Sequence, residues 1–121
     1  MEKHKQDCIF CKIVNGEIPC NKIHENIDFL AFLDINPVAE GHTVIIPKKH
    51  FDTLLDVEKE YSLAFIKFLQ DVGKVLIKKY VSNGFNIALN NGESAGQVVN
   101  HVHFHMLPRK TGDNKRGIFI G

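Results

Sequence analysis

The strongest constraint on the fold is a run near the C-terminus in which three imidazoles alternate with apolar side chains, His101-Val102-His103-Phe104-His105-Met106-Leu107. Alternation with a period of two residues is typical of a half-buried strand, so we expect the imidazoles on one face and the apolar residues in the core beneath. A strand rises about 3.3 Å per residue, which separates His101 from His105 by about 13 Å. A single metal ion therefore cannot readily bind all three imidazoles.

Composition excludes several functional classes. The 121 residues are 44% hydrophobic, which suits one globular domain, and we place it at residues 8–115 between tails at 1–7 and 116–121. A net charge of +1 and a pI near 7.8 leave no basic stripe for neutralising phosphates, so we expect no nucleic-acid partner. The charged N-terminus and the lack of an apolar stretch of about 20 residues predict a cytoplasmic protein with no membrane association.

Hydrophobic periodicity predicts an α+β fold. Extended segments separated by turn formers indicate about five strands of an antiparallel sheet, at 23–24, 29–34, 43–47, 85–89 and the histidine run. At 57–80 the apolar residues recur with helical spacing, which predicts one long helix packed across the sheet. A short N-terminal helix is expected at 8–14. Because no alternating βαβ pattern occurs, the sheet is not expected to be parallel.

The long helix carries its own end signals. Asp56 is expected to cap its N-terminus, and Lys78 and Lys79 complement the negative end of its dipole. Gly73, inside the helix, is expected to allow close packing on a strand. We assign the apolar stripe of this helix to the core and not to a cofactor.

A loop rich in small and amide residues, Asn90 to Gln97, leads into the histidine run. Glycines let backbone N–H groups approach an anion, and Asn and Gln donate further hydrogen bonds, so the loop is a candidate phosphate cradle. The alternative is a hairpin loop whose glycines serve positive φ angles. The adjacent row of imidazoles favours the phosphate cradle, because a neutral imidazole can attack phosphorus and form a phosphohistidine.

Cys8 and Cys11 are spaced as half of a tetrahedral zinc site. Two further ligands are needed to close a tetrahedral shell. A redox Cys-x-x-Cys pair and two unligated thiols remain the alternatives. Cys20, the remaining cysteine, is expected to be structural.

Together these residues resemble the histidine triad (HIT) superfamily, whose pattern of alternating histidine and apolar residues is met at 101–107. The resemblance extends through segments 8–13, 31–35, 41–50 and 96–97. It implies a HIT-like fold in which His103 attacks the α-phosphorus of a nucleotide. It also implies that His105 contacts the phosphoryl oxygens or the leaving group, and that His42 faces the phosphate.

The same resemblance assigns the binding residues. Those implied to hold the phosphate are Asn90, Gly96, Gln97 and Val98. Those implied to hold the nucleoside are Ile9, Phe10, Ile13, Phe32, Asp34 and Ile35, with Asp34 accepting from the ribose hydroxyls. Zinc-binding members of the family suggest a structural Zn²⁺ held by Cys8, Cys11, His50 and His101, and no organic cofactor. A purine nucleotide substrate, derived from AMP or GMP, and a homodimer are implied as well.

The function implied is hydrolysis of nucleoside 5′-phosphate derivatives, such as phosphoramidates and adenylates, through a nucleotidyl-His103 intermediate. Alternatives are hydrolysis of dinucleoside polyphosphates, nucleotide-dependent regulation with incidental catalysis, and a hydrolase with a catalytic zinc at the triad. Val98 departs from the Ser or Thr that many relatives carry, so a hydroxyl donor to the phosphate is missing. Arg109 is expected either to contact a second phosphate or nucleotide or to lie in solvent.

Overall fold

The computed structural model describes residues 7–113, so most of both expected tails lies outside the described residues. Its centre is a five-stranded sheet in the order β1-β2-β3-β5-β4, and every neighbouring pair is antiparallel. The strands are β1 (Lys22–Glu25), β2 (Phe29–Leu33), β3 (Thr43–Pro47), β4 (Gly84–Leu89) and β5 (Phe104–Arg109). The predicted α+β class is confirmed.

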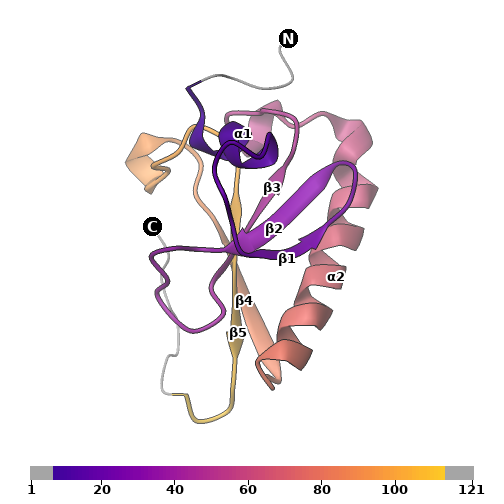
Figure 1. Cartoon of the computed structure of the whole chain (residues 1–121), viewed down its shortest axis with the longest axis vertical. Coiled ribbons are helices and arrows are strands. Elements are labelled where there is room, and N and C mark those ends of the chain that lie inside the picture. Colours follow the sequence, from indigo (N-terminus) through magenta and orange to yellow (C-terminus); the bar gives the residue numbers. More distant parts are fainter. Residues whose placement is uncertain (1–6, 114–121) are drawn as a thin grey trace.

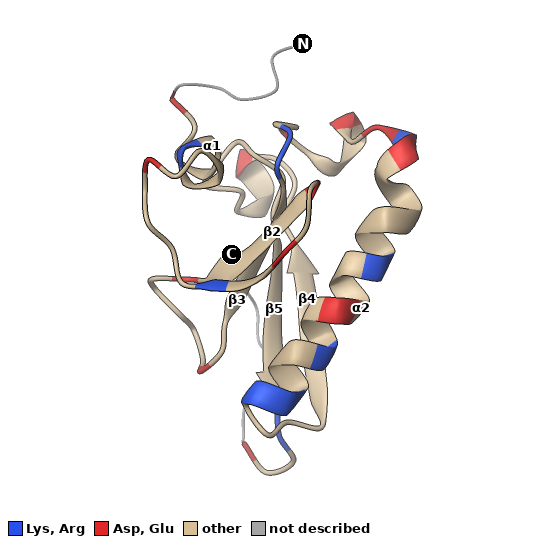
Figure 2. Cartoon of the chain, turned by 45° about the vertical axis from the view of Figure 1, so that its right-hand side comes forward, with Lys and Arg blue, Asp and Glu red and all other residues tan. Residues whose placement is uncertain are grey.

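Two α-helices accompany the sheet, α1 (Ile9–Val14) and α2 (Ser62–Lys79). Figure 1 shows α2 running along one side of the sheet, while α1 lies near the N-terminus on the other side. Short 3-10 turns occur at Leu54–Asp56, Lys59–Tyr61 and Glu93–Ala95. Neither α-helix of the described chain combines the length and apolar character needed to cross a bilayer. Figure 2 shows acidic and basic residues interspersed along α2.

Both faces of the central strands are covered, which explains their continuous apolar sequence. Phe29 and Ala31 of β2 and Ile45 of β3 pack with α2 in one core cluster. The alternating residues of the same strands point the other way and pack around the α1 segment, in a second cluster of Cys8, Phe10, Cys11, Leu30, Phe32, Val44 and Ile46. The period of two in strand side chains thus divides one apolar run between two cores.

The start of α2 differs from the prediction. Asp56 does not cap α2, because its carboxylate accepts from the backbone N–H of Thr53 at 3.0 Å and closes a capping box around the Leu54–Asp56 turn. The chain then makes a second 3-10 turn, and α2 begins at Ser62 with Tyr61 in the cap position and no side-chain cap. Asp56 does stabilise the start of a helical turn, but this turn is the short 3-10 turn Leu54–Asp56 and not α2.

The close approach predicted for Gly73 is confirmed. A Cβ added there would lie 3.2 Å from two ring carbons of Phe85 on β4, tighter than ordinary van der Waals contact. Because Gly73 has no side chain, α2 packs directly against the edge strand β4.

The histidine run is only partly a strand, which corrects the prediction. Strand β5 begins at Phe104, so His101 and His103 precede it. The reason is a different pairing, because the Val102 N–H donates to the Phe51 carbonyl at 2.7 Å and not to a sheet neighbour. Within β5 the expected alternation holds, since Met106 lies in the α2-side core and His105 lines the cavity on the opposite face.

Candidate active site and metal centre

A cavity of about 270 Å³ lies on the α1 side of the sheet. Its walls are mostly apolar, and the histidines His103 and His105 reach it. All residues predicted to hold a nucleoside line it, namely Ile9, Phe10, Ile13, Phe32, Asp34 and Ile35. An apolar pocket with a few convergent polar groups is the common form of a small-molecule site.

Several lining residues were missed from the sequence. They are Ile18, Pro19, Cys20, Leu33, Asn36, Val44 and Val99. The stretch Ile18–Cys20 follows a turn and carries no periodic pattern, so no local signal placed it there. Cys20 was expected to be structural, but its half-buried thiol lines the cavity, and burial raises the pKa of that thiol.

His103 presents one unprotonated nitrogen to the cavity. Its Nδ1–H donates to the His101 carbonyl oxygen at 2.8 Å, which places the ring proton on Nδ1 and leaves Nε2 with a free lone pair. Phe10 packs edge-on against the ring, with centroids 5.0 Å apart. Burial lowers the pKa of His103, so its imidazole stays neutral at pH 7. It therefore has the protonation state that a nucleophile requires.

His42 and His105 form a second, complementary arrangement. The Val38 N–H donates to His42 Nδ1 at 3.2 Å, so the neutral His42 ring carries its proton on Nε2. That Nε2 lies 2.9 Å from His105 Nδ1 and donates to it. The proton of His105 is consequently on Nε2. The two rings that line the cavity are thus protonated differently, with Nε2 an acceptor on His103 and a donor on His105, and their centroids are 5.0 Å apart.

His105 is expected to titrate near pH 4. Burial, together with the nearby imidazoles of His103 and His42, lowers its pKa to about 4 against the smaller opposing effect of Asp34. An unfolded histidine has a pKa near 6.5, so between about pH 6.5 and 4 the unfolded chain is protonated at this residue while the folded chain is not. The free energy of unfolding therefore falls as the pH falls through this range. NMR titration of the His105 ring signals measures the midpoint, and a value of 6 or above would contradict the assignment. Urea unfolding at pH 7 and pH 5 should show a smaller loss in His105→Asn than in the native protein.

Asp34, His42 and His105 also bring ligand-type atoms within 4.8 Å of one another, which bears on the catalytic-zinc alternative. The facing nitrogens of the two histidines are already joined by the 2.9 Å hydrogen bond, and His42 Nε2 carries the proton of that bond. A metal would need both lone pairs, so this arrangement favours a proton-sharing pair. The Asp34 carboxylate lies 3.6 Å from His42 Nε2.

The four predicted metal ligands converge, although 93 residues separate Cys8 from His101. Ligand atoms of Cys8, Cys11, His50 and His101 all lie within 4.8 Å of one another, and all four residues are buried. The S···N distances are 3.3 Å from Cys8 to His101, 3.4 Å from Cys11 to His50 and 3.6 Å from Cys11 to His101. Tetrahedral bonds of zinc to sulfur and nitrogen separate such atoms by about 3.6 Å, so the cluster has the size of a tetrahedral metal site.

The hydrogen bonds of the two histidine ligands are also those expected of metal-bound imidazoles. His101 Nε2–H donates to the Pro47 carbonyl at 2.8 Å, and His50 Nε2 lies 2.8 Å from the Asp52 carboxylate. Both bonds put the ring proton on Nε2 and leave Nδ1 free to bind a metal, as the outer partners of metal-bound histidines do. Cys8 Sγ accepts from the Cys11 N–H at 3.4 Å at the start of α1, which turns both sulfurs to one side.

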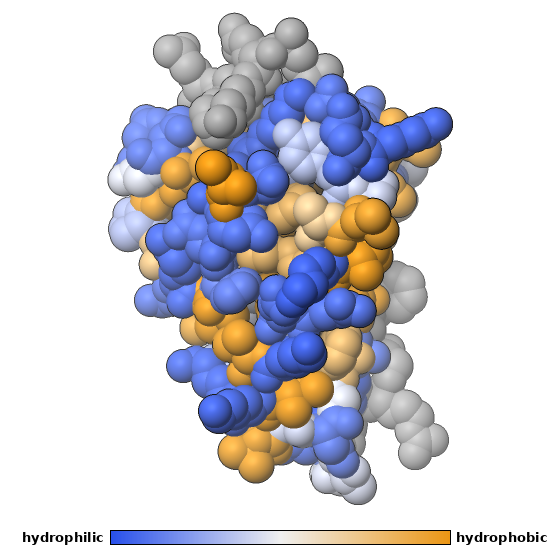
Figure 3. Space-filling model, turned by 90° about the vertical axis from the view of Figure 1, so that its right-hand side faces the viewer, coloured by the Kyte–Doolittle hydropathy of each residue, from blue (hydrophilic) through white to orange (hydrophobic). Residues whose placement is uncertain are grey.

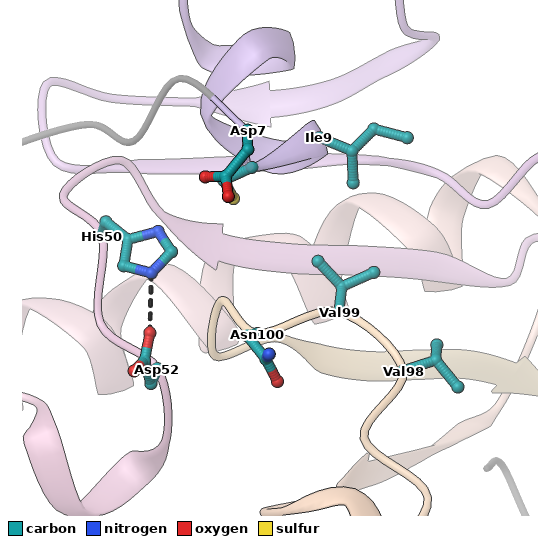
Figure 4. A pocket seen from close by; sticks show the side chains of 8 residues that line it. Asp7, Ile9, His50, Asp52, Val98, Val99 and Asn100 are labelled. Carbon is teal, nitrogen blue, oxygen red and sulfur yellow. Dashed lines mark hydrogen bonds and ion pairs between the residues drawn. The ribbon is translucent and has the colours of Figure 1, made fainter.

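A second cavity, of about 350 Å³, borders this centre. Figure 4 shows Asp7, His50, Asp52 and Asn100 around it, with the His50–Asp52 bond at its side. Cys8 and His50, two of the four ligands, are among its lining residues. It shares Ile9, Val98 and Val99 with the first cavity, and the two are therefore neighbours.

Of the four residues predicted to hold the phosphate, one lines the first cavity and three do not. Val98 lines the first cavity and is 84% exposed, whereas Asn90, Gly96 and Gln97 are not among its lining residues. Gly96 has a φ of +93°, so the positive φ angles of the hairpin interpretation are present too. The Gln97 side chain is buried and bonded to backbone groups, with its Nε2 donating to the Asp52 carbonyl at 2.6 Å. The phosphate-binding roles remain predictions.

Arg109 is bound to two side chains of the protein, and its contact with a second phosphate or nucleotide stays a prediction. Its guanidinium donates to both carboxylate oxygens of Asp113, at 2.8 and 3.0 Å, and to the Asn86 side chain at 2.6 Å. It therefore joins the turn after β5 to β4.

Relatives of this chain include proteins of several kinds of organism. An uncharacterised HIT-like protein of Methanocaldococcus jannaschii is 50% identical over 108 residues, which are 89% of this chain and 83% of that protein. The adenylylsulfatase HINT3 of Arabidopsis thaliana is 41% identical over 90% of this chain and 55% of its own length, so the chain spans little more than half of it. The adenosine 5′-monophosphoramidase HNT1 of Saccharomyces cerevisiae is 44% identical over 94% of this chain and 68% of its own length.

The same similarity appears in three dimensions. The crystal structure of SMU.412c from Streptococcus mutans superimposes with a TM-score of 0.89 and 39% sequence identity, over 100% of this chain and 77% of that one. The family model described as the HIT domain matches residues 15–112. The cavity, the convergent histidines and these matches lead to one conclusion: the chain belongs to the HIT domain family.

Proposed function

We propose that this protein is a hydrolase of AMP derivatives that cleaves nucleoside 5′-phosphate compounds at the α-phosphorus. The observation that carries the proposal is the opposite protonation of two neighbouring imidazoles in the cavity, an acceptor Nε2 on His103 and a donor Nε2–H on His105. The similarity to an adenosine 5′-monophosphoramidase and an adenylylsulfatase supports it. The names of those two enzymes indicate AMP derivatives with different leaving groups. The shared part of the two substrates is AMP, so we propose that the cavity recognises the AMP part.

The proposed reaction has two displacements. His103 Nε2 attacks the α-phosphorus, the N–P bond forms, and the bond to the leaving group breaks while His105 Nε2–H donates a hydrogen bond to that group, which takes any proton it needs from solvent. Water then attacks phosphorus and the N–P bond breaks, which returns the lone pair to His103 Nε2 and releases the nucleoside monophosphate and a proton to solvent. Fixed donors that face the developing charge cost no reorganisation, because hydrogen bonds already orient both rings.

The cavity suits a purine nucleoside. Ile9, Phe10, Ile13 and Phe32 supply the apolar surface for a base, and Asp34 supplies a carboxylate for ribose hydroxyls. Val98 lines the same cavity, which supports a role for its backbone N–H in phosphate binding, and Asn90, Gly96 and Gln97 lie in the adjoining loop.

We assign a structural Zn²⁺ to Cys8, Cys11, His50 and His101. Two thiolates and two imidazoles are a donor set that zinc prefers, and a bound zinc would fasten the α1 segment to the end of β3 and the approach to β5. With four protein ligands no position is left for a reactive water. Thiolate ligands persist in a reducing compartment, so we propose a cytoplasmic location.

A homodimer is proposed through β4 and α2. Strand β4 is an edge of the sheet, and its Phe85 and Ile87 are 41% and 45% exposed. On α2, Leu63 and Ile66 are exposed as well. Figure 3, which faces this side of the molecule, shows apolar patches between hydrophilic residues. Unpaired edges with apolar side chains favour association with a second chain.

The dimer gives a direct prediction. Light scattering should give a mass near twice the 13.7 kDa of one chain, and Ile87→Lys should reduce it to that of one chain. Ile27→Lys is the matched control, because Ile27 is 88% exposed in the turn between β1 and β2, at the far edge of the sheet. A native mass near 13.7 kDa would contradict the proposal.

Intact-protein mass spectrometry during turnover tests the function. With adenosine phosphoramidate we expect a transient AMP adduct that maps to His103, together with release of AMP. Faster turnover of diadenosine tetraphosphate than of the phosphoramidate would favour dinucleoside polyphosphate hydrolysis. AMP binding without turnover of either compound would favour a regulatory role.

A further inference from the structure

The buried carboxamide of Gln97 joins two parts of the molecule that have separate chemistry. Its Nε2 donates to the carbonyl oxygens of Asp52 and Val99, at 2.6 and 3.0 Å, and its Oε1 accepts from the Gly92 N–H at 2.7 Å. Both of its N–H groups are therefore used within the protein. In this arrangement Gln97 closes the loop at both ends and attaches it to the segment that contains Asp52.

That segment belongs to the metal centre. The Asp52 carboxylate lies 2.8 Å from His50 Nε2 and orients this ligand, while the Asp52 carbonyl accepts from Gln97. A chain of hydrogen bonds thus runs from a metal ligand through Asp52 and Gln97 to the loop that presents Val98 to the nucleotide cavity.

A second connection is shorter. His101 is a ligand of the same centre, and its carbonyl oxygen accepts from the Nδ1–H of His103 at 2.8 Å. The group that sets the tautomer of the proposed nucleophile is therefore part of a metal ligand. This second connection is buried, since His101 and His103 are at most 4% exposed. In the first connection Gln97 is buried, whereas the Asp52 side chain is 54% exposed.

We propose that the metal centre and the nucleotide cavity are energetically coupled, with Gln97 as the positioning residue between them. A metal held by His50 and His101 restricts the Asp52 segment and the His101 carbonyl, so the loop and His103 are ordered before the nucleotide arrives. A ligand that binds an already ordered site pays less conformational entropy. Thermodynamic linkage makes the effect reciprocal, so the nucleotide must tighten metal binding by the same factor. The inference rests on the proposed nucleotide site.

The coupling is measurable if the metal exchanges in the folded chain, and the cavity of about 350 Å³ gives a route for this. Cys8 and His50 line that cavity, so we expect a metal or chelator to approach the centre from this side. A coupled pair of sites typically changes affinity about 5- to 150-fold.

The test measures Zn²⁺ affinity by chelator competition with and without AMP, and AMP affinity by calorimetry with and without Zn²⁺. In the native protein we expect AMP to lower the Zn²⁺ dissociation constant at least about 5-fold, and Zn²⁺ to lower that of AMP equally. Gln97→Leu, which keeps the bulk and loses three hydrogen bonds, should reduce both factors while the direct link through His101 remains. Gln97→Glu, which can still accept from Gly92, is the second variant in case the first does not fold.

Gln70→Leu is the matched control, since Gln70 is exposed on α2, and its factors should equal those of the native protein. AMP that binds without changing Zn²⁺ affinity would overturn the coupling and leave the proposed function standing. Equal factors in Gln97→Leu and the native protein would overturn the role of Gln97. Failure of AMP to bind would overturn the proposed function, and the coupling with it.

Discussion

His103→Ala is expected to lower kcat on adenosine phosphoramidate by at least about 10⁴-fold, because removing a nucleophile removes the covalent route and leaves only binding and electrostatic effects. The change should spare AMP binding within a few fold, since the apolar walls of the cavity come from other residues. Steady-state kinetics and AMP titration measure the two effects. No AMP adduct should appear in the mass spectrum of the variant.

His24→Ala is the matched control for losing an imidazole. His24 lies on β1, outside the cavity, with its ring 5.3 Å from that of Phe68 in the α2-side core. Its kcat should match that of the native protein, while its stability falls slightly through lost packing. Turnover of His103→Ala within tenfold of the native rate would rule out the nucleotidyl-histidine mechanism.

Removal of the metal is expected to have the largest effect on stability. A ligand that binds only the folded chain, present at a thousand times its dissociation constant, adds about 4 kcal/mol to the free energy of unfolding. For a domain of this size the loss on chelation corresponds to a fall in Tm on the order of 10–20 °C. Cys11→Ser should show a comparable fall without chelator, because Cys11 is fully buried and provides one of the thiolates. Calorimetry of the zinc-loaded and chelated protein measures both.

Cys20→Ser controls for the loss of a thiol, since Cys20 lies outside the cluster and should keep both the metal and its effect on Tm. A catalytic metal gives the opposite pattern, in which chelation abolishes turnover while Tm is unchanged. An unchanged Tm on chelation would therefore count against the structural assignment.

Local patterns were sufficient for most of the fold. The helical spacing at 57–80 and the extended segments on either side predicted α2 and the strands, because side-chain periodicity follows directly from backbone geometry. Asp56 shows where such reasoning fails: a capping residue indicates that some helical turn begins, and tertiary packing decides which one. The strand predicted at His101 is wrong for a similar reason. The alternation of β5 continues back to His101, but the neighbouring Val102 pairs with Phe51 and not with a strand of the sheet.

The sequence by itself determined the candidate residues of this protein, because imidazole, thiol and carboxylate groups have few chemical uses and their spacing narrows these further. Only the tertiary structure decided how those groups divide their roles. The tautomers of His103 and His105 depend on the His101 carbonyl and on His42, and the convergence of Cys8 with His101 spans 93 residues. Gln97, predicted to bind phosphate, is directed to the backbone by contacts that no local pattern encodes. Hydrogen bonds between distant segments depend on packing, which periodicity does not specify.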